Sequence, residues 1–179
     1  SLRSCSAAKR TGHLATGKVQ NDSRTALTKR YSGRVRALII GCGYVGEALG
    51  QRLIALDHEV TGIRRSSQHN NRLAKLGIRP LNLDITQERE FEKLDAHYDQ
   101  VVIAVSPGRG GNEAYQKVFG LGVNHITKWL QRNAPTSVVF ISSTSVYRQK
   151  NAEWVQEDIA DIPENITSKT LWEAEQKIS

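Results

Sequence analysis

The chain has 179 residues, which is enough for one domain with its own apolar core and a short appendage. Its net charge of +7 is uneven, because residues 1–36 hold nine lysines and arginines against a single acid. The remaining residues hold 16 bases and 17 acids, which argues against a globular surface that binds nucleic acid.

The first 35 residues are rich in Ser, Thr, Arg and Lys, and no apolar run in them is long enough for a secretory signal or a membrane span. We predict a basic, disordered head over residues 1–35. Its composition resembles an organellar transit peptide, while a disordered tail and non-native sequence upstream of the true start are the alternatives. The two cysteines, Cys5 and Cys42, suit neither a disulfide framework nor a metal site, which favours a reducing compartment. The predicted location is the cytoplasm, or an organellar stroma or matrix if the head is a transit peptide.

A strand, a glycine-rich loop, a helix and a second strand are predicted between Arg36 and Arg65. Residues 37–40 are apolar and lead directly into the loop GCGYVG, residues 41–46. A helix with an apolar face follows, and a second apolar run covers residues 60–63. The apolar residues at helical spacing are Val45, Leu49, Leu53 and Leu56. A glycine motif in this context is typical of dinucleotide binding, whereas a glycine-rich turn without a ligand is the alternative.

Each glycine of the motif has a separate expected role. Gly41 allows the tight turn out of the strand, Gly43 leaves room for a pyrophosphate, and Gly46 lets the helix pack closely on the sheet. The phosphates would then lie over unpaired amides at the positive end of the helix dipole. We therefore predict that Gly41, Gly43, Tyr44, Val45 and Gly46 bind the cofactor.

Two arginines, Arg64 and Arg65, follow the second strand at the position that faces the adenine ribose in such a unit. An acid there would bind the 2′-hydroxyl, whereas arginine accommodates a 2′-phosphate. The pair therefore favours NADP(H) as the cofactor over NAD(H), which remains possible. The alternative is that both arginines are solvated residues at the end of a strand.

Two later strands end in further candidate cofactor residues. A short helix, residues 68–76, precedes a strand at residues 79–85, in which Asp84 either lies near the adenine amino group or caps the segment after it. A charged helix at residues 88–94 leads to an apolar strand that ends at Val105 and Ser106. Ligands bind at the carboxyl ends of strands in open parallel sheets, so we include Val105 and Ser106 in the cofactor site.

The last third of the chain completes an alternating pattern. A helix at residues 113–132 has five apolar residues on its predicted buried side, a fifth strand covers residues 137–141, and a helix begins near Thr167. The five are Val118, Leu121, Ile126, Trp129 and Leu130. We predict an α/β fold of the Rossmann type, a doubly wound parallel sheet of about five strands with right-handed crossovers.

The run FISSTSVY, residues 140–147, resembles the signature after strand five in the extended and atypical short-chain dehydrogenase/reductase superfamily, the NAD(P)-dependent epimerase/dehydratase proteins. The resemblance spans residues 36–179 and also includes GCGYVG, LDIT and PENITSKTLWEAE. It implies an NAD(P)-binding Rossmann domain over residues 36–179 and a reaction in which hydride moves between substrate and nicotinamide. Members continue further, so the resemblance also implies that the chain is C-terminally incomplete and lacks the substrate-binding part.

In that superfamily a Ser or Thr, a Tyr and a Lys perform the acid–base chemistry. The resemblance assigns the first role to Ser143 and the last to Lys169, although Lys169 is equally well explained by an ion pair with Glu173. The expected tyrosine is replaced by Asn165, whose amide does not ionise in the useful range. Tyr147 is the nearest phenol in sequence, but it matches a structural tyrosine of the signature.

Two functions therefore stay open at this point. The first is an NADP-dependent oxidoreductase or epimerase-like enzyme, with a sugar nucleotide or a small carbonyl compound as its small-molecule substrate. The second is a non-catalytic NADP(H)-binding sensor or accessory module, which Asn165 favours. Many members of the superfamily form homodimers, and the resemblance allows one here.

Overall fold

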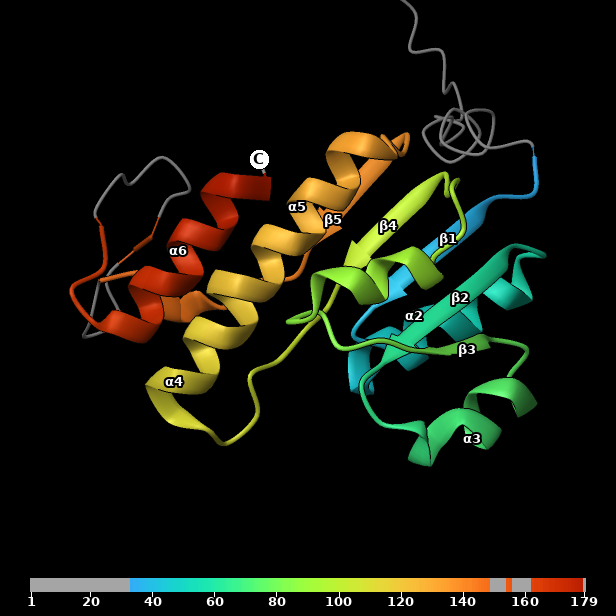
Figure 1. Cartoon of the computed structure of the whole chain (residues 1–179), viewed down its shortest axis with the longest axis horizontal. Helices are drawn as coiled ribbons and strands as arrows, with labels where there is room; N and C mark the ends of the chain where they lie inside the picture. The colour runs from blue at the N-terminus through green and yellow to red at the C-terminus, as the bar shows by residue number, and fades with distance from the viewer. Residues whose placement is uncertain (1–32, 149–153, 156–161, 179) are drawn as a thin grey trace, which may run out of the picture. The chain divides into compact units, whose positions relative to one another are not determined.

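The computed structural model describes residues 33–148, 154–155 and 162–178, and its compact unit begins at Gly33. The predicted head thus lies outside the described residues except for residues 33–35. Five strands form one sheet in the order β3-β2-β1-β4-β5, and all four neighbouring pairs are parallel (Figure 1). The strands are β1 (Arg36–Ile40), β2 (Glu59–Arg64), β3 (Arg79–Asn82), β4 (Gln100–Ile103) and β5 (Ser137–Phe140). This confirms the predicted Rossmann-type α/β fold.

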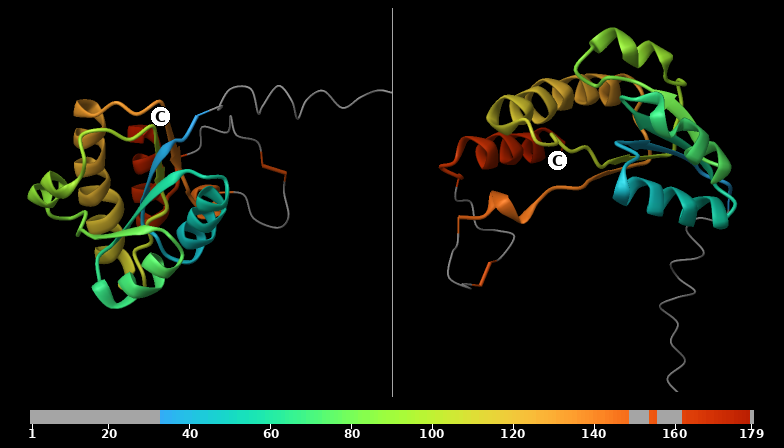
Figure 2. Two further views of the ribbon diagram at one scale, coloured as in Figure 1. Left: turned by 90° about the vertical axis from the view of Figure 1, so that its right-hand side faces the viewer. Right: turned by 90° about the horizontal axis from the view of Figure 1, so that it is seen from below.

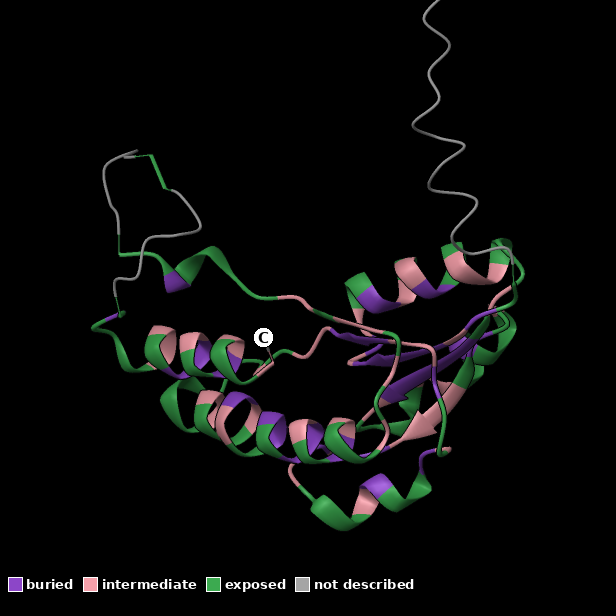
Figure 3. Cartoon of the chain, turned by 90° about the horizontal axis from the view of Figure 1, so that it is seen from above, coloured by how far each residue is buried: buried purple, intermediate pink, exposed green. Residues whose placement is uncertain are grey.

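Helices cover both faces of the sheet (Figure 2). They are α2 (Tyr44–Ala55), α3 (Asn70–Lys75), α4 (Gly111–Tyr115), α5 (Val123–Arg132) and α6 (Ile166–Ile178). One face packs on α2 and α3 around Ile39 and Leu73, and the other packs on α5 around Leu38 and Trp129. Helix α6 lies against α5 and the turn before it rather than directly on the central strands (Figure 3). No helix in the described part of the chain is long and apolar enough to cross a membrane.

Helix α2 confirms only the middle of the apolar stripe predicted for it, because Leu49 and Leu53 pack against the core. Val45 and Leu56 are about half exposed, whereas Gly46 and Gly50 are its buried residues. A Cβ on Gly50 would lie 2.6 Å from a side-chain atom of Ile78. The glycines therefore define the contact face and bring the helix backbone close to the sheet, which leaves the predicted ends of the apolar stripe in solvent.

The long helix predicted at residues 113–132 is present, but its middle differs from an α-helix. Residues Gln116–Gly122 form a π-helical turn between α4 and α5. Such a turn inserts an extra residue and shifts the phase of the side chains after it. Leu121, which was expected on the apolar side, is consequently 45% exposed, while Phe119 and Val123 are buried. The segment predicted as a helix at residues 88–94 is a 3-10 turn at Glu88–Lys93.

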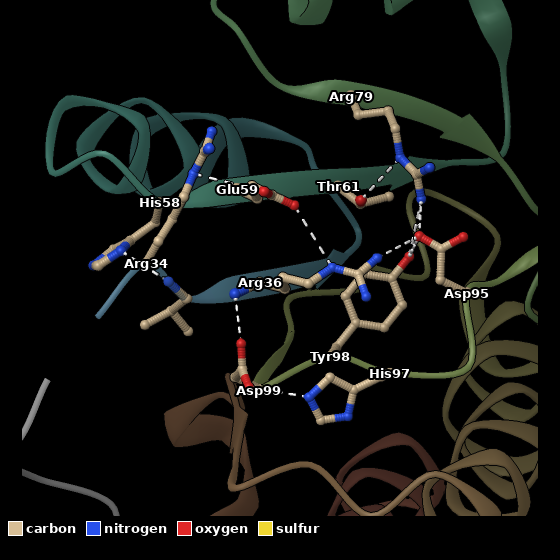
Figure 4. A network of polar contacts seen from close by, with 11 residues as sticks. Arg34, Arg36, His58, Glu59, Thr61, Arg79, Asp95, His97, Tyr98 and Asp99 are labelled. Atoms are coloured by element: carbon tan, nitrogen blue, oxygen red, sulfur yellow. Dashed lines mark hydrogen bonds and ion pairs between the residues drawn. The ribbon is translucent and has the colours of Figure 1, made fainter. Parts of the chain in front are cut away.

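A paired polar network closes the amino edge of the sheet, opposite the carboxyl ends of the strands (Figure 4). One carboxylate oxygen of Asp95 accepts from Arg36 of β1 at 2.8 Å and from Arg79 of β3 at 2.6 Å. The buried Tyr98 contributes its hydroxyl, which accepts from Arg79 at 3.2 Å. The network joins β1 and β3 to the segment that enters β4.

Asp99 in the same network is expected to make the free energy of unfolding depend on pH in the acidic range. The backbone N–H of Arg36 donates to its carboxylate at 2.7 Å and holds the pKa of Asp99 below its ordinary value. Because the folded pKa is lowered, the stabilisation is complete above about pH 4 and disappears as pH falls through the folded value. The difference in free energy of unfolding between wild type and Asp99→Asn should therefore shrink as urea titrations move below pH 4. The same series with His97→Gln controls for the neighbouring imidazole, and a difference that stays constant with pH would contradict the expectation.

Candidate functional site

A cleft of about 210 Å³ opens at the carboxyl ends of β1, β2, β3 and β4. The chain runs from β1 to β2 on one side and returns to β4 on the other, so this is the point where strand order reverses and where open parallel sheets bind ligands. Six of the residues predicted to bind the cofactor line it: Gly41, Arg64, Arg65, Asp84, Val105 and Ser106. The structure thus brings together residues from four separate segments of the sequence.

The glycine corner between β1 and α2 leaves a set of amides available. The N–H groups of Gly41 and Cys42 donate to the carbonyl of Ile63, and that of Gly43 donates to Gly41. The next three N–H groups begin α2, and they have no protein acceptor among the described residues. They belong to Tyr44, Val45 and Gly46. The part of the corner that can bind an anion is therefore the first turn of the helix, including Gly46, rather than the amides of Gly41 and Gly43.

The three glycines of the corner differ in what surrounds them. Gly41 has a φ of +92°, and a Cβ there would lie 2.5 Å from the carbonyl oxygen of Ala104. A Cβ on Gly46 would lie 2.8 Å from both the Gly41 carbonyl oxygen and a side-chain atom of Ile39, which is the close helix–sheet packing expected from the sequence. A Cβ on Gly43 would meet no atom within 4 Å. Only Gly43 leaves space that a ligand can use.

Cys42, at the variable position of the motif, is fully buried. Burial raises the pKa of its thiol to about 11, and the nearby Arg64 lowers it by less. The thiol is therefore not ionised near neutral pH, and Cys42 fills space beside the sheet rather than acting as a nucleophile.

The loop at Asp84 is held by contacts that sequence reasoning missed. The N–H of Asp84 donates to the Glu90 carboxylate at 2.6 Å, which lowers the pKa of Glu90. The ring Nδ1 of the buried His125 lies 2.9 Å from the carbonyl oxygen of Ile85. Asp84 itself accepts from the N–H and hydroxyl of Thr86, and the following 3-10 turn has no side-chain cap. Asp84 therefore shapes its own loop rather than capping the next element.

Arg64 lies at the boundary between the cleft and a second hollow of about 300 Å³. Its Nη1 donates to the carbonyl of Cys42 at 3.2 Å, so the guanidinium rests against the glycine corner. Arg65 is exposed, and it lines the cleft but not the second hollow. The two arginines thus lie near the position that the 2′-phosphate of the adenine ribose would take if a dinucleotide bound at the corner.

The predicted catalytic residues are placed apart from the cleft. Among the described residues that line it, neither Ser143 nor Lys169 appears. The Ser143 hydroxyl accepts from the N–H of Ser145, and Lys169 is exposed on α6. Glu173, the alternative partner of Lys169, forms no ion pair with it in the structure.

Asn165 has a structural role at the start of α6. Its side-chain oxygen accepts from the N–H of Thr167 at 2.9 Å and from the Thr167 hydroxyl at 2.6 Å, as an N-cap does. Asn165 and Ser168 line a third hollow of about 560 Å³, and Tyr147 lines it from the other side. Asn165 thus begins the helix at the position where the resemblance expected a proton donor.

Comparison with known proteins agrees with this architecture. The model of the NAD dependent epimerase/dehydratase family matches residues 37–169. No curated protein matches the chain. A solved structure from Methylobacillus flagellatus, provisionally described as an NAD-dependent epimerase/dehydratase, is 31% identical over 80% of this chain, with a TM-score of 0.64. The UDP-glucuronic acid 4-epimerase of Bacillus cereus, solved in complex with NAD, is 21% identical over 79% of this chain, with a TM-score of 0.63.

A further solved structure, provisionally described as an epimerase from Burkholderia cenocepacia, is 22% identical over 81% of this chain, with a TM-score of 0.67. The chain covers 50% of each of these three proteins. It therefore spans about half the length of the solved structures that it resembles.

Proposed function

Because this chain belongs to the NAD dependent epimerase/dehydratase family, we propose that it binds a nicotinamide dinucleotide at the GCGYVG corner and acts as an oxidoreductase or epimerase-like protein. The observation that carries the proposal is the set of three N–H groups without a protein acceptor, on Tyr44, Val45 and Gly46, beside the open space at Gly43. The pyrophosphate would accept from these amides at the positive end of α2. The adenosine would then lie along the cleft toward Asp84.

We further propose that the preferred cofactor is NADP(H). Arg64 is partly buried, is fixed against the glycine corner by its bond to Cys42, and borders both hollows there. A guanidinium in this position can form charge-assisted hydrogen bonds with a 2′-phosphate. Arg65, exposed on the cleft side, adds a second positive charge.

Arg64→Glu is expected to weaken NADPH binding about ten- to a hundredfold while changing NADH binding much less, because only NADPH carries the phosphate that arginine would contact. Fluorescence titrations of both cofactors measure this. Arg132→Glu on α5 makes the same change in charge on the opposite face of the sheet and should affect neither cofactor. An equal loss for NADPH and NADH in Arg64→Glu would refute the phosphate assignment.

The proposed reaction, hydride transfer to or from a bound nicotinamide, uses two side chains of this chain, Ser143 and Lys169. A bound nicotinamide dinucleotide supplies the hydride donor or acceptor. By resemblance, the Ser143 hydroxyl would orient the substrate oxygen and Lys169 would supply a positive charge nearby. We propose a small carbonyl compound or a sugar nucleotide as substrate, in keeping with the family. Asn165 does not supply the proton, because its amide does not ionise and its oxygen already caps α6.

A non-catalytic NADP(H)-binding module is the second candidate, and the capping role of Asn165 favours it. The test is to measure NADPH binding by fluorescence and then NADPH oxidation with a panel of carbonyl compounds and sugar nucleotides. Turnover that is lost in Ser143→Ala supports the enzyme. Tight binding with no turnover across the panel supports the module, and failure of the wild type to bind either cofactor contradicts both.

A further inference from the structure

The second hollow beside the glycine corner lies outside the cleft and contains charges that the sequence motifs did not single out. It is lined from α2, from Arg64 at the end of β2 and from the segment around α3. Its polar side chains beyond Tyr44 and Gln51 are Glu47, Arg64, His69 and Arg72. The hollow thus offers two arginines and one carboxylate next to the open space at Gly43.

Within it, Glu47 and Arg72 form an ion pair between α2 and α3. The Nε and Nη2 of Arg72 donate to the same carboxylate oxygen of Glu47, at 2.8 and 2.6 Å. The Glu47 side chain is only 12% exposed, whereas the Arg72 side chain is 68% exposed. Glu47 also lies in the first turn of α2, where the helix dipole favours a negative charge. The carboxylate is therefore the fixed partner, and the guanidinium is the one that can turn toward a ligand.

We propose that Glu47 sets the cofactor preference by competing with the 2′-phosphate of NADP(H) for the guanidinium of Arg72. The inference rests on the proposed binding of a dinucleotide at the glycine corner. A 2′-phosphate beside Arg64 would enter the hollow from the cleft side, since Arg64 lines both. A phosphate monoester carries more charge and more acceptor oxygens than a carboxylate, and arginine binds it with a pair of parallel hydrogen bonds.

This exchange distinguishes the two cofactors. With NADPH, Arg72 leaves Glu47 and joins Arg64 on the phosphate. The free energy needed to break the Glu47–Arg72 ion pair therefore weakens NADPH binding. With NADH no phosphate is present, and the Glu47–Arg72 pair stays intact. Glu47 is thus a specificity-determining residue that contacts no part of the cofactor, and Arg72 is a second phosphate ligand.

A double-mutant cycle tests the competition. Dissociation constants for NADPH and NADH are measured in the wild type, Arg72→Gln, Glu47→Gln and the double variant. Displacement of NADPH by 2′,5′-ADP probes the adenosine half with its 2′-phosphate, without the nicotinamide. Arg72→Gln should weaken NADPH about tenfold and leave NADH unchanged. Glu47→Gln should tighten NADPH about fivefold, and this gain should vanish in the double variant because the competing guanidinium is gone.

The controls distinguish competition for Arg72 from a purely structural role of the Glu47–Arg72 pair. They also distinguish failure of this inference from failure of the proposed function. Lys75→Gln removes a positive charge from the same helix, outside the residues that line the hollow, and should change neither constant. Thermal unfolding of every variant checks folding, and Glu47→Asp replaces Glu47→Gln if the latter does not fold. Equal changes for NADPH and NADH, or a Glu47→Gln gain that persists without Arg72, would overturn the competition. A wild type that binds neither cofactor would instead overturn the proposed function and this inference with it.

Discussion

Replacing Gly43 with alanine is expected to weaken binding of both NADPH and NADH by on the order of a hundredfold, about 2.8 kcal/mol, while leaving the folding midpoint unchanged. In the free protein an added Cβ would meet no atom within 4 Å, and the φ of Gly43 is −92°, within the range of an L-residue. In the proposed complex the same methyl group would occupy the space of the pyrophosphate over the first turn of α2. The measurement is a pair of fluorescence titrations with thermal unfolding of each sample.

The matched control is Gly120→Ala. A Cβ at Gly120 also meets no atom within 4 Å, and this glycine lies in the π-helical turn without itself lining the cleft. If both alanine variants bind the cofactors as the wild type does, the pyrophosphate does not pass over Gly43, and the proposed binding mode is wrong.

The sheet was predictable because most of its strands are centred on short apolar segments, such as ALII in β1, VVI in β4 and VVF in β5. Strands buried on both faces are largely apolar, so residues 37–40 and 60–63 were recognisable without any alternation, although the second segment includes the buried Thr61. The observed strands extend these two runs by one or two residues. The glycines between β1 and α2 fixed the position of the corner, because a positive φ at Gly41 and close packing at Gly46 exclude other residues.

The helix faces were less predictable, since the tertiary contacts decide them. Spacing correctly placed Leu49 and Leu53 against the core, but Val45 and Leu56 are exposed because the buried Gly46 and Gly50 centre the contact face of α2. The π-helical turn before α5 changed the phase at Leu121 in the same way. Gly120 and Gly122 lower the helix propensity of that segment, but a low propensity does not specify which kind of turn forms.

The polar contacts that shape the site join residues far apart in the sequence. Glu47 meets Arg72 across 25 residues, and His125 meets the carbonyl of Ile85 across 40. Neither pair belongs to a motif with a fixed spacing, so only the fold brings them together. Asn165 is different, because an Asn before a helix is a usual N-cap. That signal is present in the sequence at the same position where the resemblance places a catalytic tyrosine.

Gly41→Ala is expected to destabilise the protein by about 2–5 kcal/mol, the largest effect on folding among the changes considered. Two costs combine at this position. The φ of +92° is unfavourable for an L-residue, and the added Cβ would lie 2.5 Å from the Ala104 carbonyl oxygen and 2.8 Å from the Val105 nitrogen. Both neighbours are backbone atoms where β4 ends, and the N–H of Ala104 donates to the carbonyl of Ile40, so the strand end cannot move aside without breaking that bond.

Gly108→Ala separates the two costs. Gly108 has a φ of +70°, but a Cβ there would meet no atom within 4 Å, so this variant should lose only the conformational part, about 1–2 kcal/mol. Urea unfolding of both variants at one pH gives the comparison, with similar slopes required for the difference to be meaningful. The excess loss in Gly41→Ala measures how tightly β1 and β4 approach at the cleft. Equal losses in the two variants would mean that the turn alone, and not this approach of the two strand ends, requires a glycine at the corner.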